Sequence, residues 1–156
     1  MKNIFFAFLF LVVGGMASGC YDCGPQAEPA ISLSVYFPPT DTLLRVSALG
    51  VKADSAFREF RISGFNGGGQ APLSLLQDST TYLFYFTDRV DTLTLFYERI
   101  FDSRRQCGYY VDIAEPKGRR YHSNFRDVQA TYYPYIGEIK GLKHSTAYGI
   151  SVSVFR

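Results

Sequence analysis

Cys20 and Cys23 are the first residues of the chain whose types and spacing could do chemistry. A C-x-x-C pair can form a thioredoxin-like redox site or one half of a zinc site. A thioredoxin-like pair lies between a strand and a helix of a βαβ unit, whereas this pair precedes the first expected strand. His122 and His144 are the only histidines, and neither has a second ligand at zinc spacing. The sequence therefore disfavours both a redox site and a zinc site.

The segment before Cys20 predicts export. Lys2 precedes an unbroken apolar run at 4–13, and small residues follow the run up to Gly19. This is the layout of a secretory signal peptide, and the run is shorter than the ~20 residues that span a bilayer. The letters ASGC at 17–20 resemble a bacterial lipobox, which implies cleavage after Gly19 and diacylation of Cys20. Plain secretion after cleavage by a general signal peptidase is the alternative.

Cys23 and Cys107 remain once Cys20 carries lipid. The compartment outside the cytoplasmic membrane permits disulfides, and two cysteines allow a single intramolecular pairing. We therefore expect a Cys23–Cys107 disulfide that joins the start of the mature chain to a late strand. Two free thiols or an intermolecular bond are the alternatives.

The charge balance excludes one class of partner. The chain has a formal net charge of +2, and loss of Lys2 with the signal peptide leaves about +1. Capture of nucleic acid by charge requires a basic face, so no nucleic acid is expected as a partner. Aromatic residues make up 17% of the chain, all of them Phe and Tyr, and such a composition favours strands.

Alternation of apolar and polar residues predicts an all-β domain over 31–156, after a signal peptide at 1–19 and a lipidated tether at 20–30. The clearest expected strands are Ile31–Phe37, Thr81–Thr87, Thr92–Glu98, Cys107–Ile113 and Ala147–Phe155. A further short strand is expected at Leu73–Leu76, and the glycine-rich stretch Gly64–Gly69 reads as a connecting loop. About eight short strands with frequent turns indicate an antiparallel, immunoglobulin-like β-sandwich, with a closed barrel as the alternative.

The strongest candidate for a binding surface is the tyrosine cluster of Tyr132, Tyr133 and Tyr135. Tyrosine presents a rigid apolar ring with a polar tip, which suits sugar rings or protein partners. The alternative is that these rings simply pack along a sheet edge. Five arginines could form a cationic patch or stand as solvated strand ends: Arg99, Arg104, Arg105, Arg119 and Arg120.

No residue is predicted to be catalytic and no metal or cofactor is predicted. The chain contains neither G-x-S-x-G nor H-E-x-x-H. Four aspartates lie in expected turns without the ordered spacing of a calcium loop: Asp78, Asp88, Asp91 and Asp102.

Four segments resemble a family of small uncharacterised lipoproteins from Bacteroidetes, whose domain has no known function. They are APLSLL at 71–76, DSTTYLF at 78–84, DTLTLFY at 91–97 and SRRQCG at 103–108. The resemblance implies a lipid anchor at Cys20 and supports the disulfide between Cys23 and Cys107. It brings no catalytic residues.

These observations predict a non-catalytic lipoprotein of the bacterial envelope that acts through binding or assembly. Tyr21 follows the acylated cysteine where Asp would retain a lipoprotein in the inner membrane, so the outer membrane is expected, with the domain facing the periplasm. The membrane is contacted through the lipid, and the expected partner is another envelope protein or a glycan. The alternative is a carbohydrate-binding module or a hydrolase that uses the tyrosine cluster.

Overall fold

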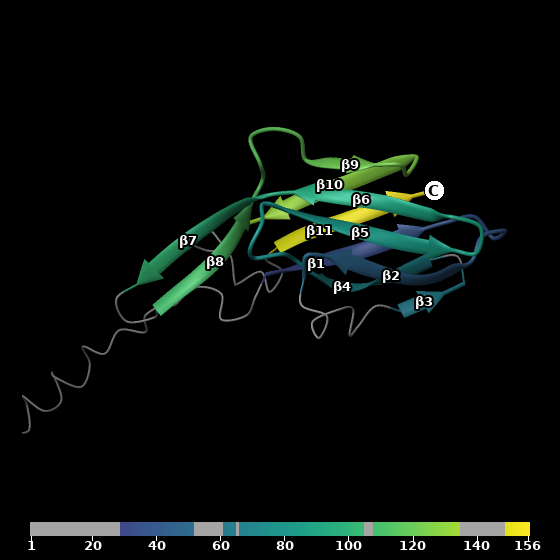
Figure 1. Ribbon diagram of the computed structural model, residues 1–156, viewed down its shortest axis with the longest axis horizontal. Helices are drawn as coiled ribbons and strands as arrows, with labels where there is room; N and C mark the ends of the chain where they lie inside the picture. The colour runs from purple at the N-terminus through teal and green to yellow at the C-terminus, as the bar shows by residue number, and fades with distance from the viewer. Residues whose placement is uncertain (1–28, 52–60, 65, 105–107, 135–148) are drawn as a thin grey trace, which may run out of the picture.

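The computed structural model describes residues 29–51, 61–64, 66–104, 108–134 and 149–156, which contain strands and no helix (Figure 1). The strands are β1 (Ala30–Tyr36), β2 (Leu43–Leu49), β3 (Arg61–Ser63), β4 (Asn66–Pro72), β5 (Ser79–Phe86), β6 (Val90–Phe96), β7 (Glu98–Arg104), β8 (Gly108–Ala114), β9 (Tyr121–Ser123), β10 (Asp127–Tyr133) and β11 (Gly149–Phe155). The all-β class is therefore confirmed. The described residues hold eleven strands and not about eight.

The strands form three sheets. Sheet A has the order β10-β11-β1-β4-β3, and sheet B has the order β2-β5-β6-β9. Strands β7 and β8 pair only with each other and form a hairpin. All pairs are antiparallel except that of β1 with β11, which is parallel.

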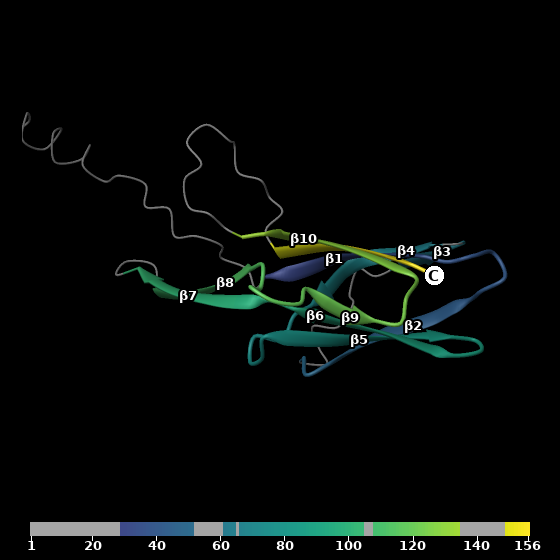
Figure 2. The ribbon, with the colours of Figure 1, turned by 90° about the horizontal axis from the view of Figure 1, so that it is seen from above.

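Sheets A and B lie one above the other and enclose a common core (Figure 2). Successive side chains of a strand point to opposite faces, so each apolar alternation places every second side chain inward. On sheet A the buried residues include Ile31, Leu33 and Val35 of β1 and Ile150, Val152 and Val154 of β11. On sheet B they include Tyr82, Phe84 and Phe86 of β5 and Leu93 and Leu95 of β6. The expected inward faces of these strands are confirmed.

Two expected elements are wrong. Gly67, Gly68 and Gly69 lie within β4, where a connecting loop was expected. The stretch 73–76 is not a strand but the crossing from sheet A to sheet B. Its backbone is held by side chains, since the Tyr97 hydroxyl donates to the Ser74 carbonyl at 2.7 Å.

The β7–β8 hairpin extends beyond the two sheets, as both views of the ribbon show (Figures 1 and 2). Alternation aligns Tyr109, Val111 and Ile113 on one side of the strand. Ile113 is fully buried, but Tyr109 is 91% exposed because no other described strand lies beneath the far end of the hairpin. This side of β8 is therefore buried at one end of the strand and exposed at the other.

Candidate binding surface

Tyr132 does not belong to a binding surface. Its side chain points into the core from β10 and is 9% exposed. Its hydroxyl donates to the backbone carbonyls of Phe96, at 2.7 Å, and Arg120, at 3.1 Å. Burial raises the pKa of Tyr132 to about 12, with a further increase from the charge of Glu115 and an opposing effect of Arg120. This tyrosine therefore ties β10 to sheet B, and its predicted role in binding is wrong.

Tyr133 lies on the opposite side of β10 and is 46% exposed. Adjacent residues of a strand point to opposite faces, so Tyr132 and Tyr133 could not have shared one surface. The other predicted site residues lie outside the described residues: Cys20, Cys23, Cys107 and Tyr135. Their lipidation, disulfide and binding roles stay predictions.

Two of the five arginines, Arg99 and Arg120, form ion pairs, and the side chains of Arg104, Arg105 and Asp102 lie outside the described residues. Arg99 Nε donates to Asp78 Oδ1 at 2.6 Å, and its Nη1 donates to the Leu75 carbonyl. Arg120 pairs with Glu115. These pairs neutralise part of the expected cationic patch. Among the described residues, no group of acidic, histidine or cysteine side chains could hold a metal ion.

The outer face of sheet A brings together side chains from five strands. It consists of the side chains that point away from the core on β10, β11, β1, β4 and β3. The pairing registers arrange them in three rows: Thr131, Ser151, Ser32 and Gln70; Gln129, Ser153, Ser34, Gly68 and Arg61; Asp127, Phe155, Tyr36, Asn66 and Ser63. Hydroxyl and amide groups dominate these rows, and Tyr133 stands at one end of the face.

Several polar side chains on β1 and β4 of this face form no hydrogen bond with described residues, whereas Gln129 on β10 donates to Asp127 at 3.5 Å. Within the described part of the chain, no protein atom forms a hydrogen bond with the side chains of Ser32, Ser34, Asn66 or Gln70. Ser32, Asn66 and Gln70 are exposed and Ser34 is half-buried. Their donors and acceptors are therefore available to a ligand.

An aromatic pair lies at one end of the rows. The rings of Tyr36 on β1 and Phe155 on β11 are stacked, with centroids 5.0 Å apart and an interplanar angle of 10°. Tyr36 is 42% exposed. Because β11 and β4 flank β1 on opposite sides, stacking on Phe155 covers one ring face and leaves the other toward β4.

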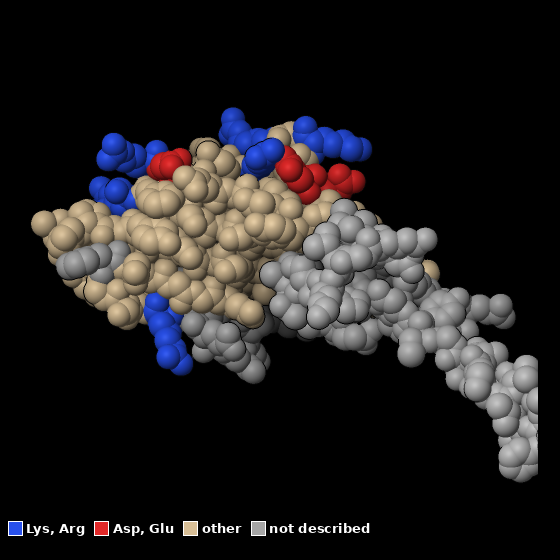
Figure 3. Space-filling view, turned by 180° about the vertical axis from the view of Figure 1, so that it is seen from behind, with Lys and Arg blue, Asp and Glu red and all other residues tan. Residues whose placement is uncertain are grey.

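Few charged side chains stand on this side of the molecule. The space-filling view from behind Figure 1, which looks onto sheet A, shows a mostly uncharged surface whose Lys, Arg, Asp and Glu gather near its edges (Figure 3). On β1, β4 and β11 every outward side chain in the three rows is uncharged. A ligand selected by strong charge would find little to bind here.

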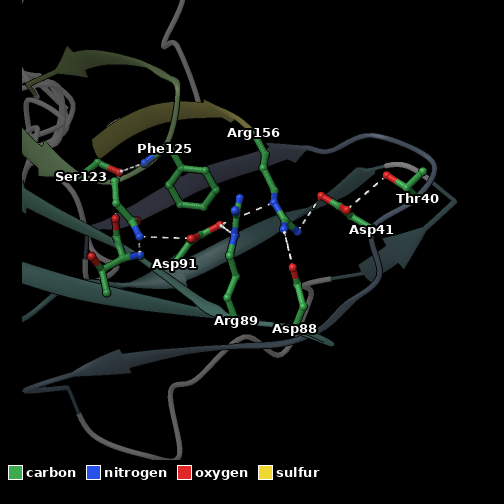
Figure 4. A network of polar contacts seen from close by, with 10 residues as sticks. Thr40, Asp41, Asp88, Arg89, Asp91, Ser123, Phe125 and Arg156 are labelled. Carbon is green, nitrogen blue, oxygen red and sulfur yellow. Dashed lines mark hydrogen bonds and ion pairs between the residues drawn. The ribbon is translucent and has the colours of Figure 1, made fainter.

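Charged residues concentrate instead around Arg156, at one end of the two sheets (Figure 4). Arg156 lies 2.6 Å from Asp41 and 3.3 Å from Asp88, and its guanidinium carbon is 4.2 Å from the ring centre of Phe86. The Asp41 contact is an ion pair without an aligned hydrogen bond. The charged end of β11 is thereby joined to the turns of sheet B.

Asp91 completes this Arg156 cluster. Its side chain is 4% exposed and lies 3.7 Å from Arg156 and 3.2 Å from Arg89. Asn124 donates its amide to Asp91 at 3.1 Å and accepts from the backbone of Thr92 at 2.7 Å. The carboxylate is thus surrounded by protein donors, and the cluster is a structural contact between the sheets.

Comparison with known proteins adds no relative. No family model, no curated protein and no solved structure matches this chain. The described residues also include no helix long and apolar enough to cross a membrane.

Sequence reasoning missed the outer face of sheet A. The alternation of ISLSVYF at 31–37 does direct Ser32, Ser34 and Tyr36 away from the core. Nothing in the sequence shows which strands lie beside β1, so Asn66 and Gln70 could not be assigned to the same surface.

Proposed function

We propose that the protein is a lipid-anchored, non-catalytic binding protein of the bacterial cell envelope, with the outer face of sheet A as its binding surface. The observation that carries this proposal is the set of hydroxyl and amide side chains beside the exposed Tyr36 ring that form no hydrogen bond with described residues. A preformed surface of this kind suits recognition by many weak polar contacts.

The anchor in this proposal is diacylated Cys20, on the outer membrane and facing the periplasm. The signal-like segment at 4–13 and the lipobox-like letters at 17–20 support it. The proposed Cys23–Cys107 disulfide would fasten the domain close to the lipid. The family of small Bacteroidetes lipoproteins that the sequence resembles supports both assignments.

The scaffold proposed for this role is an immunoglobulin-like β-sandwich. Two sheets share one core, and consecutive strands lie in different sheets at β1 and β2, β2 and β3, β4 and β5, and β9 and β10. The parallel pairing of β1 with β11 departs from a purely antiparallel sandwich. A central strand paired on both sides leaves its outer side chains in fixed positions, as a binding surface requires.

Fractionation tests the anchor. Full-length protein expressed in a host that processes lipoproteins should sediment with membranes, and Cys20→Ala should release it. Membrane association that persists in Cys20→Ala would contradict lipidation. Peptide mapping without reductant should recover Cys23 linked to Cys107, and two alkylated thiols in folded protein would contradict the disulfide.

Retention on washed cell envelopes tests the binding surface. Processed full-length protein in detergent should sediment with envelopes of cells that lack it. Ser34→Arg, at the centre of the outer face of sheet A, should weaken retention at least tenfold. The matched control is Ser47→Arg, on the outer side of β2 in sheet B, which should bind like the parent. Equal retention of both variants, or none of the parent, would refute this binding role.

A carbohydrate-binding module is the second candidate. The exposed ring of Tyr36 and the neutral polar rows around it favour this candidate. Tyr132 cannot contribute to it from the core, and Tyr133 lies at the other end of the same face.

A further inference from the structure

We infer that the outer face of sheet A binds a neutral glycan, and that the sugar rings lie over Gly68. The Gly68 patch consists of Ser34, Tyr36, Asn66, Gly68 and Gln70, which belong to the neighbouring strands β1 and β4. This inference rests on the proposed function and names the chemistry of its ligand.

Gly68 leaves an open strip of backbone in the middle of the patch. Its side of β4 faces outward, between Asn66 and Gln70. A Cβ at this position would meet only the Leu33 carbonyl at 3.5 Å and the Ser34 hydroxyl at 4.0 Å, which are ordinary contacts. Gly68 is not among the glycines with positive φ. Neither crowding nor backbone conformation therefore requires glycine here.

A glycine inside a strand has a cost, because it loses more backbone freedom on folding than other residues and packs no side chain. Where the protein itself does not need it, such a glycine often marks a place where a ligand approaches the backbone closely. Ser34, directly opposite Gly68, is also small. A flat ring could thus rest against both strands.

Tyr36 provides an apolar wall beside this strip. Phe155 covers one face of its ring, and the free face is directed toward β4. Asn66 lies directly opposite Tyr36 in the register. The C–H face of a pyranose ring is apolar and can stack on an aromatic ring. The tyrosine ring also has a polar hydroxyl at its tip. Stacking on Phe155 also holds Tyr36 in place before the ligand binds.

The amides and hydroxyls of the patch can form hydrogen bonds with the hydroxyl groups around a sugar ring. Asn66 and Gln70 flank Gly68 and are about 13 Å apart along the strand, from the ~3.3 Å rise per residue. An amide both donates and accepts, and so does a serine hydroxyl, as does every hydroxyl of a sugar. Arg61 on β3 lies opposite Gly68 and adds donors at the outer edge. The spacing suits several consecutive sugar units.

The composition favours a glycan over a protein partner. Protein interfaces concentrate their binding energy in buried aromatic, Met and Arg anchors within apolar pockets. The Gly68 patch has a single exposed ring among four small or amide residues. A nucleic acid or an anionic lipid surface would require several cations, and the patch itself has none.

The decisive variant is Gly68→Val. Valine is favoured in strands, and the contacts at this position accept a Cβ, so this variant should be at least as stable as the parent. Its side chain would stand where the sugar ring lies. We expect that full-length protein in detergent binds neutral oligosaccharides on a glycan array, and that Gly68→Val weakens the strongest interaction at least tenfold by calorimetry.

Two variants keep this test falsifiable. Ser47→Val adds the same side chain to the outer side of sheet B and should bind like the parent. Gln70→Ala removes one exposed amide without filling space and should weaken binding about threefold to tenfold, the loss of one hydrogen bond. Array binding that survives Gly68→Val, or no array binding by folded parent protein, would overturn the inference.

Chemical treatment of the envelopes separates this inference from the proposed function. Periodate cleaves the vicinal diols of sugars and should abolish retention of the parent, whereas protease treatment should leave it intact. Retention that resists periodate and is lost on proteolysis would identify a protein partner; the glycan inference would then be wrong and the proposed function would stand.

Discussion

Two polar regions of this molecule, the Arg156 cluster and the outer face of sheet A, use their polar groups in opposite ways. In the cluster, charged groups from turns of both sheets meet one another, and Asp91 is almost fully buried among donors. On the outer face, the side chains of Ser32, Ser34, Asn66 and Gln70 lie on the neighbouring strands β1 and β4 without hydrogen bonds to described residues. The difference separates side chains that stabilise the fold from side chains that are free to bind.

This difference predicts which substitutions should reduce stability and which should reduce binding. Removing a partner from a buried ion pair leaves an uncompensated charge, which is costly for stability. Removing an exposed, unpaired hydroxyl leaves nothing unsatisfied in the protein. Substitutions in the Arg156 cluster should therefore affect unfolding, and substitutions on the outer face of sheet A should affect binding.

The largest effect is expected for Arg156→Ala. This variant removes the ion pairs with Asp41 and Asp88 and the contact with Phe86. It leaves Asp91 with Arg89 as its charged partner and Asn124 as a neutral donor. Breaking such a buried pair should lower the free energy of unfolding by about 3 kcal/mol, measured by urea unfolding. Glycan and envelope binding of the folded protein should be unchanged.

Arg119→Ala is the matched control, because this arginine is exposed. Its unfolding free energy should stay within about 0.5 kcal/mol of the parent. Equal effects of the two variants would show that the Arg156 cluster does not stabilise the fold, and the comparison would fail.

An intermediate effect on the free energy of unfolding is expected at high pH from ionisation of Tyr132, which points into the core from β10. Burial raises the pKa of Tyr132 to about 12, above the 10 of a free tyrosine. Between pH 10 and 12 the unfolded chain ionises at this position while the folded chain stays neutral. The contribution of Tyr132 to the free energy of unfolding should therefore be complete below pH 10 and fall by about 2 to 3 kcal/mol as the pH rises through this window.

Urea unfolding at pH 9, 10, 11 and 12 measures this loss in the parent and in Tyr132→Phe. Burial also raises the pKa values of Tyr82 and Tyr97, so a weaker pH dependence should remain in the variant. Tyr133→Phe, on the exposed side of β10, is the matched control for this substitution. An identical pH dependence in Tyr132→Phe would contradict the buried position of Tyr132.

The smallest effect on stability is expected for Ser34→Ala on the outer face of sheet A. Its hydroxyl has no partner among described residues, so the free energy of unfolding should change by less than about 0.5 kcal/mol. Envelope retention should nevertheless weaken. A loss of stability of 1 kcal/mol or more would show that Ser34 serves the fold, and would remove the contrast between the two regions.

Much of the fold follows from local pattern. The alternation in 31–37 and 149–155 corresponds to β1 and β11, whose inward side chains are buried as expected. The hairpin of β5 and β6 around the turn at 87–89 also follows from pattern. The prediction failed for the glycine-rich stretch, which suggests a loop in the sequence. Three glycines lie in β4 instead, because the backbone of this segment pairs with the strands on both sides of it.

The proposed binding surface could be predicted from the sequence even less well than the fold. Three adjacent aromatic residues in sequence suggest one surface at 132–135, but a strand turns Tyr132 into the core and Tyr133 outward. The residues that do lie together come from β1 and β4, about thirty positions apart in the chain. Such proximity depends on long-range pairing, which no local sequence signal reports.

The sequence by itself determined the all-β class, the inward faces of the main strands, and the expectation of an exported, lipid-anchored chain. The first two follow from the period of the side chains, and the third from an N-terminal segment that resembles a signal peptide. Only the tertiary structure decided which polar residues are consumed by the protein and which remain unpaired, because hydrogen bonding and burial depend on the neighbours of each side chain across the sheets. The packing of the two sheets places Tyr132 in the core, Arg156 among carboxylates, and Ser34 and Gln70 on an open surface.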